Sequence, residues 1–134
     1  METRKITIPI DPVGKGRPRF TRNGHAYTPA KTVAAELIIG TYARHQWKDE
    51  PLKQQVNARM TFFMPIPKGV AKKYLADFQS EKLGHLKRPD LDNMVKLLAD
   101  ALNGIIWADD SQIFNLHACK LYSANPRIEL EIFY

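Results

Sequence analysis

Alternating apolar and polar residues predict the strands of this chain. Near the N-terminus, "RKITIPI" places Ile6, Ile8 and Ile10 on one side of an extended segment. Near the C-terminus, "QIFNLHACKLY" and "RIELEIFY" predict two more strands, and "IIW" at 105–107 predicts a short one. In "QVNARMTFFM" the apolar side chains also recur at every second position, at Val56, Ala58, Met60, Phe62 and Met64.

Two longer stretches instead have the periodicity of amphipathic helices. In the first, Thr28 is expected to cap the helix, Pro29 to take its first position, and the helix to run to about Trp47. Its expected buried face is Val33, Leu37, Ile38 and Tyr42. The second runs from about Asp90 to Asn103 and stops at Gly104, a residue typical of helix C-termini. Its expected buried face is Leu91, Met94, Val95, Leu98 and Leu102.

With a short helix within 68–80, the order of elements is β-α-β-α-α-β-β-β. This order predicts an α+β fold, in which the two main helices pack against a mixed sheet of about four to five strands. The chain has 134 residues, contains no repeat or linker, and is long enough for one core. We therefore assign residues 1–134 to a single domain.

Charge indicates the class of partner. The chain has 20 Lys and Arg against 14 Asp and Glu, a net charge of +6, which favours a polyanionic partner. No apolar run approaches the ~20 residues of a membrane-spanning helix, and the N-terminus lacks a signal-peptide pattern. The single cysteine, Cys119, cannot form an internal disulfide, and no histidine pair has zinc-ligand spacing. We expect a cytoplasmic protein that binds nucleic acid, with neither a membrane nor a small molecule as partner.

A basic segment, "DPVGKGRPRFTRNGH", follows the first strand and is too rich in Gly and Pro for a regular element. Such a segment is usually a solvated loop, but flexible cations of this kind also suit contacts with DNA phosphates. Its candidate phosphate-binding residues are Lys15, Arg17, Arg19 and Arg22. Lys87, Arg88 and Lys120 would extend the same surface.

Carboxylates gather at two places in this basic chain. In "KRPDLDNMVK", Asp90 suits a helix N-cap, and Asp92 could form a surface ion pair with Lys96 one turn later. In "WADDS", Asp109 and Asp110 suit a turn. However, the chain can double back after the helix and return one of these two residues to the helix N-terminus. Three converging carboxylates form the kind of oxygen-rich site that Mg²⁺ prefers, and the spacing does not fit an EF-hand.

The central block, "KRPDLDNMVKLLADALNG" followed by "IIWADDSQI" and "NLHACK", resembles the RusA family of Holliday-junction resolvases. The early "PIDPVGKGRPRF" also resembles an N-terminal form found in that family. The resemblance implies a homodimeric, Mg²⁺-dependent endodeoxyribonuclease, with Mn²⁺ as a substitute, that cuts two opposing strands of a four-way DNA junction. It implies a metal-binding triad of Asp90, Asp92 and Asp110, and a catalytic role for Lys96; Asp109 stays an alternative to its neighbour.

Three other functions fit the same residues. In the first, the chain is a basic DNA-binding module and its aspartates are only caps and turns; saturable Mg²⁺ binding would distinguish it from an enzyme. In the second, the chain is a nuclease that acts on forks or flaps. In the third, it binds junctions without cutting them, although every matched catalytic position is intact.

Overall fold

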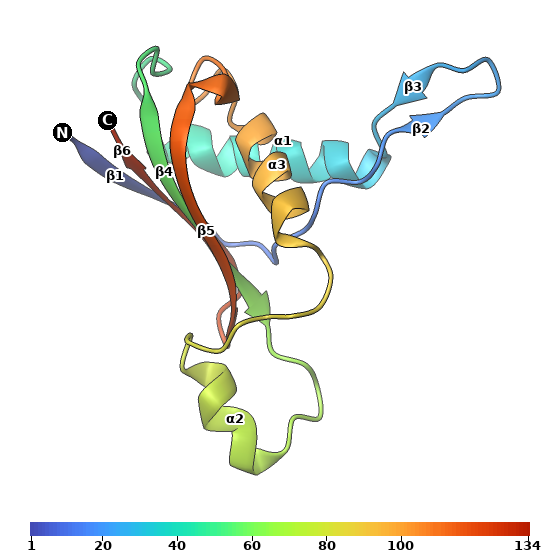
Figure 1. Ribbon diagram of the computed structural model, residues 1–134, viewed down its shortest axis with the longest axis vertical. Coiled ribbons are helices and arrows are strands. Elements are labelled where there is room, and N and C mark those ends of the chain that lie inside the picture. Colours follow the sequence, from blue (N-terminus) through green and yellow to red (C-terminus); the bar gives the residue numbers. More distant parts are fainter.

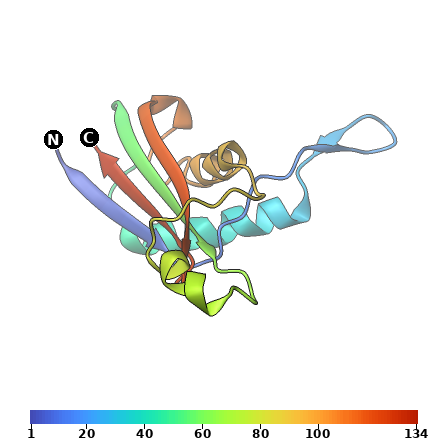
Figure 2. The same ribbon diagram turned by 60° about the horizontal axis from the view of Figure 1, so that its bottom comes forward.

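The computed structural model describes residues 1–134 as a mixed four-stranded sheet with helices on one face (Figures 1 and 2). The sheet order is β1-β6-β4-β5. Strand β6 pairs antiparallel with both β1 and β4, whereas β4 and β5 run parallel. The strands are β1 (Thr3–Ile8), β4 (Val56–Pro65), β5 (Ile113–Ser123) and β6 (Arg127–Phe133). The predicted α+β fold with a mixed sheet is confirmed.

Helices α1 (Ala30–Gln46) and α3 (Leu91–Ala101) cover the sheet, and the short α2 (Lys72–Gln79) lies at its lower end in Figure 1. Strands β2 (Arg19–Phe20) and β3 (Ala26–Tyr27) form a small hairpin that projects from the body beside the start of α1. None of these helices combines the length and the apolar character needed to cross a membrane.

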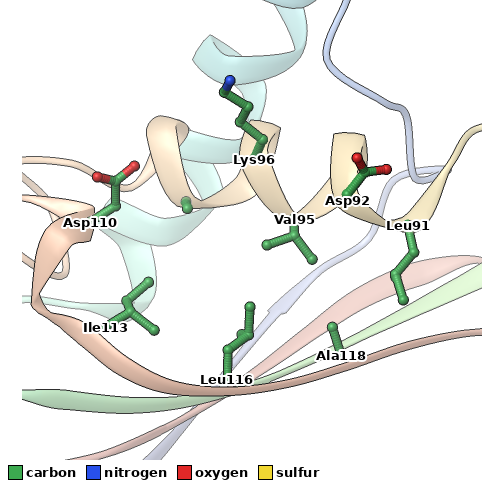
Figure 3. A pocket seen from close by; sticks show the side chains of 9 residues that line it. Leu91, Asp92, Val95, Lys96, Asp110, Ile113, Leu116 and Ala118 are labelled. Carbon is green, nitrogen blue, oxygen red and sulfur yellow. The ribbon is translucent and has the colours of Figure 1, made fainter.

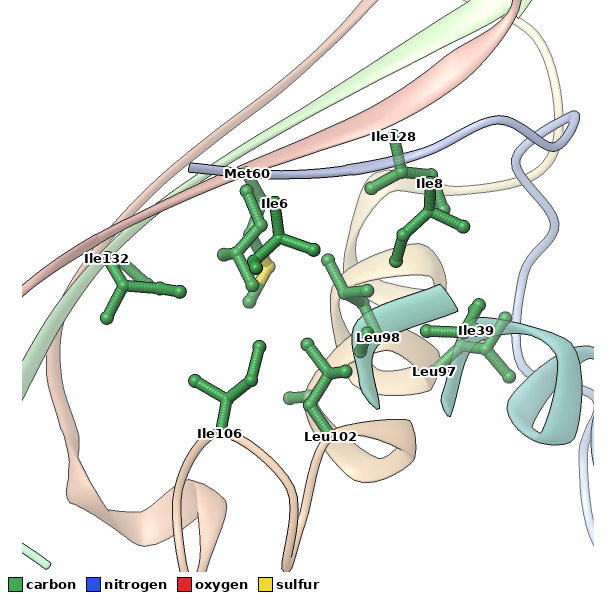
Figure 4. Packing of buried hydrophobic residues seen from close by; sticks show 14 of the residues in the cluster. Ile6, Ile8, Ile39, Met60, Leu97, Leu98, Leu102, Ile106, Ile128 and Ile132 are labelled. Atoms are coloured by element: carbon green, nitrogen blue, oxygen red, sulfur yellow. The ribbon is translucent and has the colours of Figure 1, made fainter. Parts of the chain in front are cut away.

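The core lies between the sheet and the two main helices (Figure 4). In β1, β6 and most of β4 every second residue faces it, as the alternation predicted, whereas β5 is exposed or half-buried over most of its length. Burial of each large apolar side chain contributes about 1.5–3 kcal/mol. The strand side chains that face the helices include Ile6, Ile8, Met60, Ile128, Leu130 and Ile132. They meet Ile39, Leu97, Leu98, Leu102 and Ile106 from the helical side, and all eleven are at most 1% exposed.

Helix α3 largely follows its prediction. Asp90 is its N-cap residue, but the Asp90 carboxylate makes no capping hydrogen bond. Three of the five residues expected on the buried face are buried, namely Met94, Leu98 and Leu102. The other two, Leu91 and Val95, are half-buried and line a pocket.

The predicted buried face of α1 is wrong. Its four residues are exposed, with Leu37 at 64%, whereas the residues facing the core are Thr32, Ala35, Ile39, Gly40 and Ala43. Most of these are small, which lets α1 approach α3 closely: a Cβ on Gly40 would lie 3.3 Å from Ile105 Cδ1. Large side chains on that face would hold the helices apart. The helix also begins at Ala30, with Pro29 as N-cap and no side-chain cap, so Thr28 lies outside it.

The predicted short strand at 105–107 is also wrong. Gly104 has a positive φ of 77°, and its backbone N–H donates to the carbonyl of Trp107 at 2.7 Å. The chain therefore turns back on itself, and Trp107 makes only isolated bridges, to Leu52 and Asn103.

Candidate active site

A pocket of about 660 Å³ lies between α3 and the first half of β5 (Figure 3). Its apolar lining comes from Leu91, Val95, Ala99, Ile113, Leu116 and Ala118. Three charged residues, Asp92, Lys96 and Asp110, complete the lining, and in Figure 3 their side chains point away from the sheet. We call these three residues the charged rim.

Helical geometry aligns two members of the charged rim. Asp92 and Lys96 are four residues apart on α3, so they lie one turn apart on the same side of the helix. Both side chains are exposed, which leaves them accessible to a substrate.

The third member, Asp110, is held by a short 3₁₀ turn, Asp110–Gln112. Asp109 caps this turn: its carboxylate accepts from the Ser111 N–H at 3.1 Å, and its own N–H donates to Gln112 Oε1 at 2.8 Å. The Gln112 amide in turn donates to the backbone carbonyls of Leu52 and Gln54. Asp109 thus builds the turn, and its hydrogen bonds to Ser111 lower its pKa.

Buried Trp107 anchors the segment that returns Asp110 to the helix. Its indole N–H donates to the carbonyl of Ala99 at 3.2 Å, and the Ala108 N–H donates to Leu52 at 3.0 Å. These bonds bring the turn alongside the later part of α3. The sequence had predicted its return to the N-terminus of the helix; instead the immediate acidic neighbour of Asp110 is Asp100.

Asp90 lies apart from the charged rim. It lines a neighbouring pocket of about 370 Å³, together with Gly14, Lys15, Arg88, Pro89 and Asn93. Residues two positions apart point to different sides of a helix, so Asp90 and Asp92 diverge at the start of α3. No three His, Cys, Asp or Glu side chains are close enough to hold one metal ion. The convergence of three carboxylates expected from the sequence is therefore not present; two of them, Asp92 and Asp110, share a pocket.

Asp100 is a residue of this region that the sequence analysis missed. Burial opposes its ionisation, but hydrogen bonds with Lys15 and Asp110 outweigh this effect and lower the pKa of Asp100. Conversely, the hydrogen bond with Asp100, together with burial and repulsion, raises the pKa of Asp110. The sequence does contain a signal: Asp92, Lys96 and Asp100 recur at four-residue intervals and so form one polar line along α3.

The predicted DNA-binding cations fall into two groups. Arg17, Arg19 and Arg22 lie in the projecting segment 17–28, which we call the arm; they are exposed and form no ion pair. Lys87 and Arg88, just before α3, are likewise exposed and unpaired.

The other two predicted cations, Lys15 and Lys120, are engaged inside the protein. Lys120 Nζ donates to the carbonyls of Lys87 at 2.5 Å and Pro89 at 2.8 Å, which shapes the approach to α3. Lys15 contacts the carboxylate of Asp100. Because a lysine held in this way has less freedom to reach a phosphate, the predicted cations that remain free are those of the arm and of residues 87–88.

The charged rim has the donors that a hard divalent cation requires. Mg²⁺ is commonly held by one or two carboxylates, several waters and the phosphate oxygens of a substrate. Asp92 and Asp110 supply two carboxylates at an open pocket mouth, and Lys96 adds a positive charge beside them. The oxygen donors present therefore fit the chemistry of a magnesium-type site that is completed by water and a phosphate ligand, with Asp92 and Asp110 at opposite ends of the pocket (Figure 3).

A family model and one relative match this chain over most of its length, and a second relative matches about a third of it. A family model described as Endodeoxyribonuclease RusA matches residues 9–133. The "Uncharacterized protein YqaN" of Bacillus subtilis (strain 168) is 35% identical over 137 residues, covering 98% of this chain and 96% of that protein. The "Crossover junction endodeoxyribonuclease rusA" of Lactococcus phage r1t is 48% identical over 46 residues, covering 34% of this chain and 35% of that protein. The family match spans both the charged rim and the arm, so the chain belongs to the RusA endodeoxyribonuclease family.

Proposed function

We propose that this protein is a Mg²⁺-dependent, structure-selective endodeoxyribonuclease that resolves four-way DNA junctions in recombination and repair. The observation that carries the proposal is the charged rim, where Asp92, Lys96 and Asp110 line one pocket in a basic chain. The family match and the name of the phage relative support the same activity.

Asp92 and Asp110 would hold one or two divalent cations, and Mn²⁺ is expected to substitute for Mg²⁺. A bound divalent cation supplies the Lewis acid that lowers the pKa of a water molecule and stabilises charge on the phosphoryl oxygens. Lys96 would lie beside the same phosphate and neutralise the charge that develops in the transition state. Asp90 remains a proposed third ligand, and would act from the neighbouring pocket.

The arm and residues 87–88 would bind the DNA backbone. Their five unpaired cations, Arg17, Arg19, Arg22, Lys87 and Arg88, suit phosphates, and the affinity should then fall steeply with salt. Paired cuts in a symmetric junction require two active sites, which we propose are supplied by a homodimer with two-fold symmetry.

Cleavage of three labelled substrates tests the proposal: a four-way junction, a fork and a linear duplex, each with Mg²⁺, with Mn²⁺ and with EDTA. We expect symmetric paired cuts in the junction, little cutting of the duplex, and none in EDTA. Preferred cutting of forks would instead identify a nuclease for other branched DNA. Binding without cutting under every condition would identify a DNA-binding module and refute the proposed nuclease activity.

A further inference from the structure

The segment that precedes the arm is docked between the two main helices. The Lys15 N–H donates to the carbonyl of Asn93 on α3 at 3.0 Å, and the Gly16 N–H donates to Thr32 Oγ1 on α1 at 2.9 Å. Thr32 is only 3% exposed, so this second bond reaches into the protein. The basic segment that the sequence predicted to be an exposed loop is therefore anchored at residues 14–16.

Close contacts explain the glycines on either side of Lys15. A Cβ on Gly14 would lie 2.8 Å from Pro89 Cβ, just before α3. A Cβ on Gly16 would lie 2.9 Å from Thr32 Oγ1 and 3.0 Å from Pro29 Cγ, at the start of α1. The "GKG" segment thus fits against both helix N-termini only because two of its residues lack side chains.

The side chain of Lys15 extends the same connection. Its Nζ contacts Asp100 Oδ2 on α3 and lies 3.8 Å from Glu36 Oε1 on α1. The Lys15 side chain is 23% exposed, in contrast to the exposed arginines of the arm. One ammonium therefore bridges carboxylates from both helices, directly below the base of the arm.

We propose that Lys15 is a positioning residue that fixes the base of the arm against the catalytic helix through Asp100 and Glu36. This inference rests on the function proposed above. Asp100 lies on α3, the helix that also carries Asp92 and Lys96, so the bridge ties the base of the arm to the helix of the charged rim. The Lys15 side chain thus acts together with the backbone bonds of residues 15 and 16 to hold the base of the arm against α3.

Four variants test whether Lys15 positions the site or binds phosphate. Lys15→Gln and Asp100→Asn each break the bridge, Lys15→Arg keeps its charge, and Arg17→Gln removes an unpaired cation two residues away. For each, kcat and KM for junction cleavage are measured, together with junction affinity at several salt concentrations.

The positioning role predicts that Lys15→Gln lowers kcat by at least ~10-fold and leaves the salt slope of binding unchanged. Combining it with Asp100→Asn should add little, because both changes break one interaction. Lys15→Arg should recover most of kcat. Arg17→Gln should raise KM and reduce the salt slope by about 1, with kcat retained. The proposal is overturned if Lys15→Gln instead behaves like Arg17→Gln.

Amide hydrogen exchange without DNA separates this inference from the proposed function. Lys15→Gln and Asp100→Asn should both speed exchange at the amides of Lys15 and Gly16 at least several-fold, whereas Arg17→Gln should not. Having two variants keeps the test valid if one of them does not fold. Unchanged exchange in the folded variants would refute the bridge, even if the protein proves to be no nuclease; faster exchange would support it in either case.

Discussion

Helices α1 and α3 cover the same face of the sheet, but they bury opposite kinds of side chain. Helix α3 places large residues such as Leu97 and Leu98 in the core and its polar line outward, along the pocket. Helix α1 buries Ala35, Gly40 and Ala43 and leaves Leu37 64% exposed. Close contact between two helices requires small residues on at least one of them, so the size of α3's side chains decides which face of α1 turns inward.

The largest expected effect is the loss of DNA cleavage on substitution in the polar line of α3. Asp92→Asn should lower junction cleavage by ~10²–10³-fold or more, because it removes a proposed metal ligand and its charge. Junction binding should persist or strengthen, since a negative charge near DNA is lost. Gel-based cleavage and binding assays measure both effects, and Asp77→Asn, an exposed carboxylate on α2, is the matched control. Full cleavage by Asp92→Asn in Mg²⁺ would remove Asp92 from the site.

The next largest effect is expected from substitutions of buried residues on both helices. Leu98→Ala on α3 and Ile39→Ala on α1 should each lower the free energy of unfolding by about 2–5 kcal/mol, because each leaves a cavity in the core. Urea denaturation followed by circular dichroism measures the change. A loss below about 1 kcal/mol for Ile39→Ala would show that α1 does not face the core as described.

A smaller loss of stability is expected from a substitution at the contact between α1 and α3. Gly40→Leu should destabilise the protein by about 1–3 kcal/mol, since its side chain would be forced against Ile105 and the backbone of Ala101. The same denaturation experiment measures it. Thr41→Leu, one position along the same helix and exposed, is the control and should be tolerated. Equal stability of the two variants would contradict the close approach.

The smallest effect belongs to the exposed face of α1. Leu37→Ser should change the free energy of unfolding by no more than about 0.5 kcal/mol, because the side chain is already largely in water. A loss of several kcal/mol that depends on protein concentration would instead place Leu37 in a subunit interface.

These two helices also show what periodicity can and cannot predict. In α3 only one stripe is apolar, so the prediction identified Met94, Leu98 and Leu102 correctly. In α1 two stripes fit about 3.6 residues per turn, one of large residues and one of small residues. The prediction that the stripe of large residues is buried was wrong. Which stripe is buried depends on the surface of α3, and α3 lies far along the chain. The prediction of a strand at 105–107 was wrong for a local reason, because the chain turns at Gly104.

The same limit applies to the candidate site. Spacing along one helix correctly placed Asp92 and Lys96 on the same side, and the "DD" turn returns to the same pocket. Sequence could not specify where along α3 it returns, because that depends on tertiary bonds from Trp107 and Gln112. It also could not distinguish Lys15 from the arginines of the arm, since all are cations in one glycine-rich segment.

The central claim is that Asp92 and Asp110 both bind divalent cations at the charged rim. Line broadening of backbone amide NMR signals by Mn²⁺ tests it most directly, because the method detects weak as well as tight binding. We predict that the strongest broadening occurs at residues 91–93 and 109–111, and that Asp92→Asn and Asp110→Asn each abolish it around the substituted residue. Broadening centred elsewhere, or unchanged in both variants, would contradict the account.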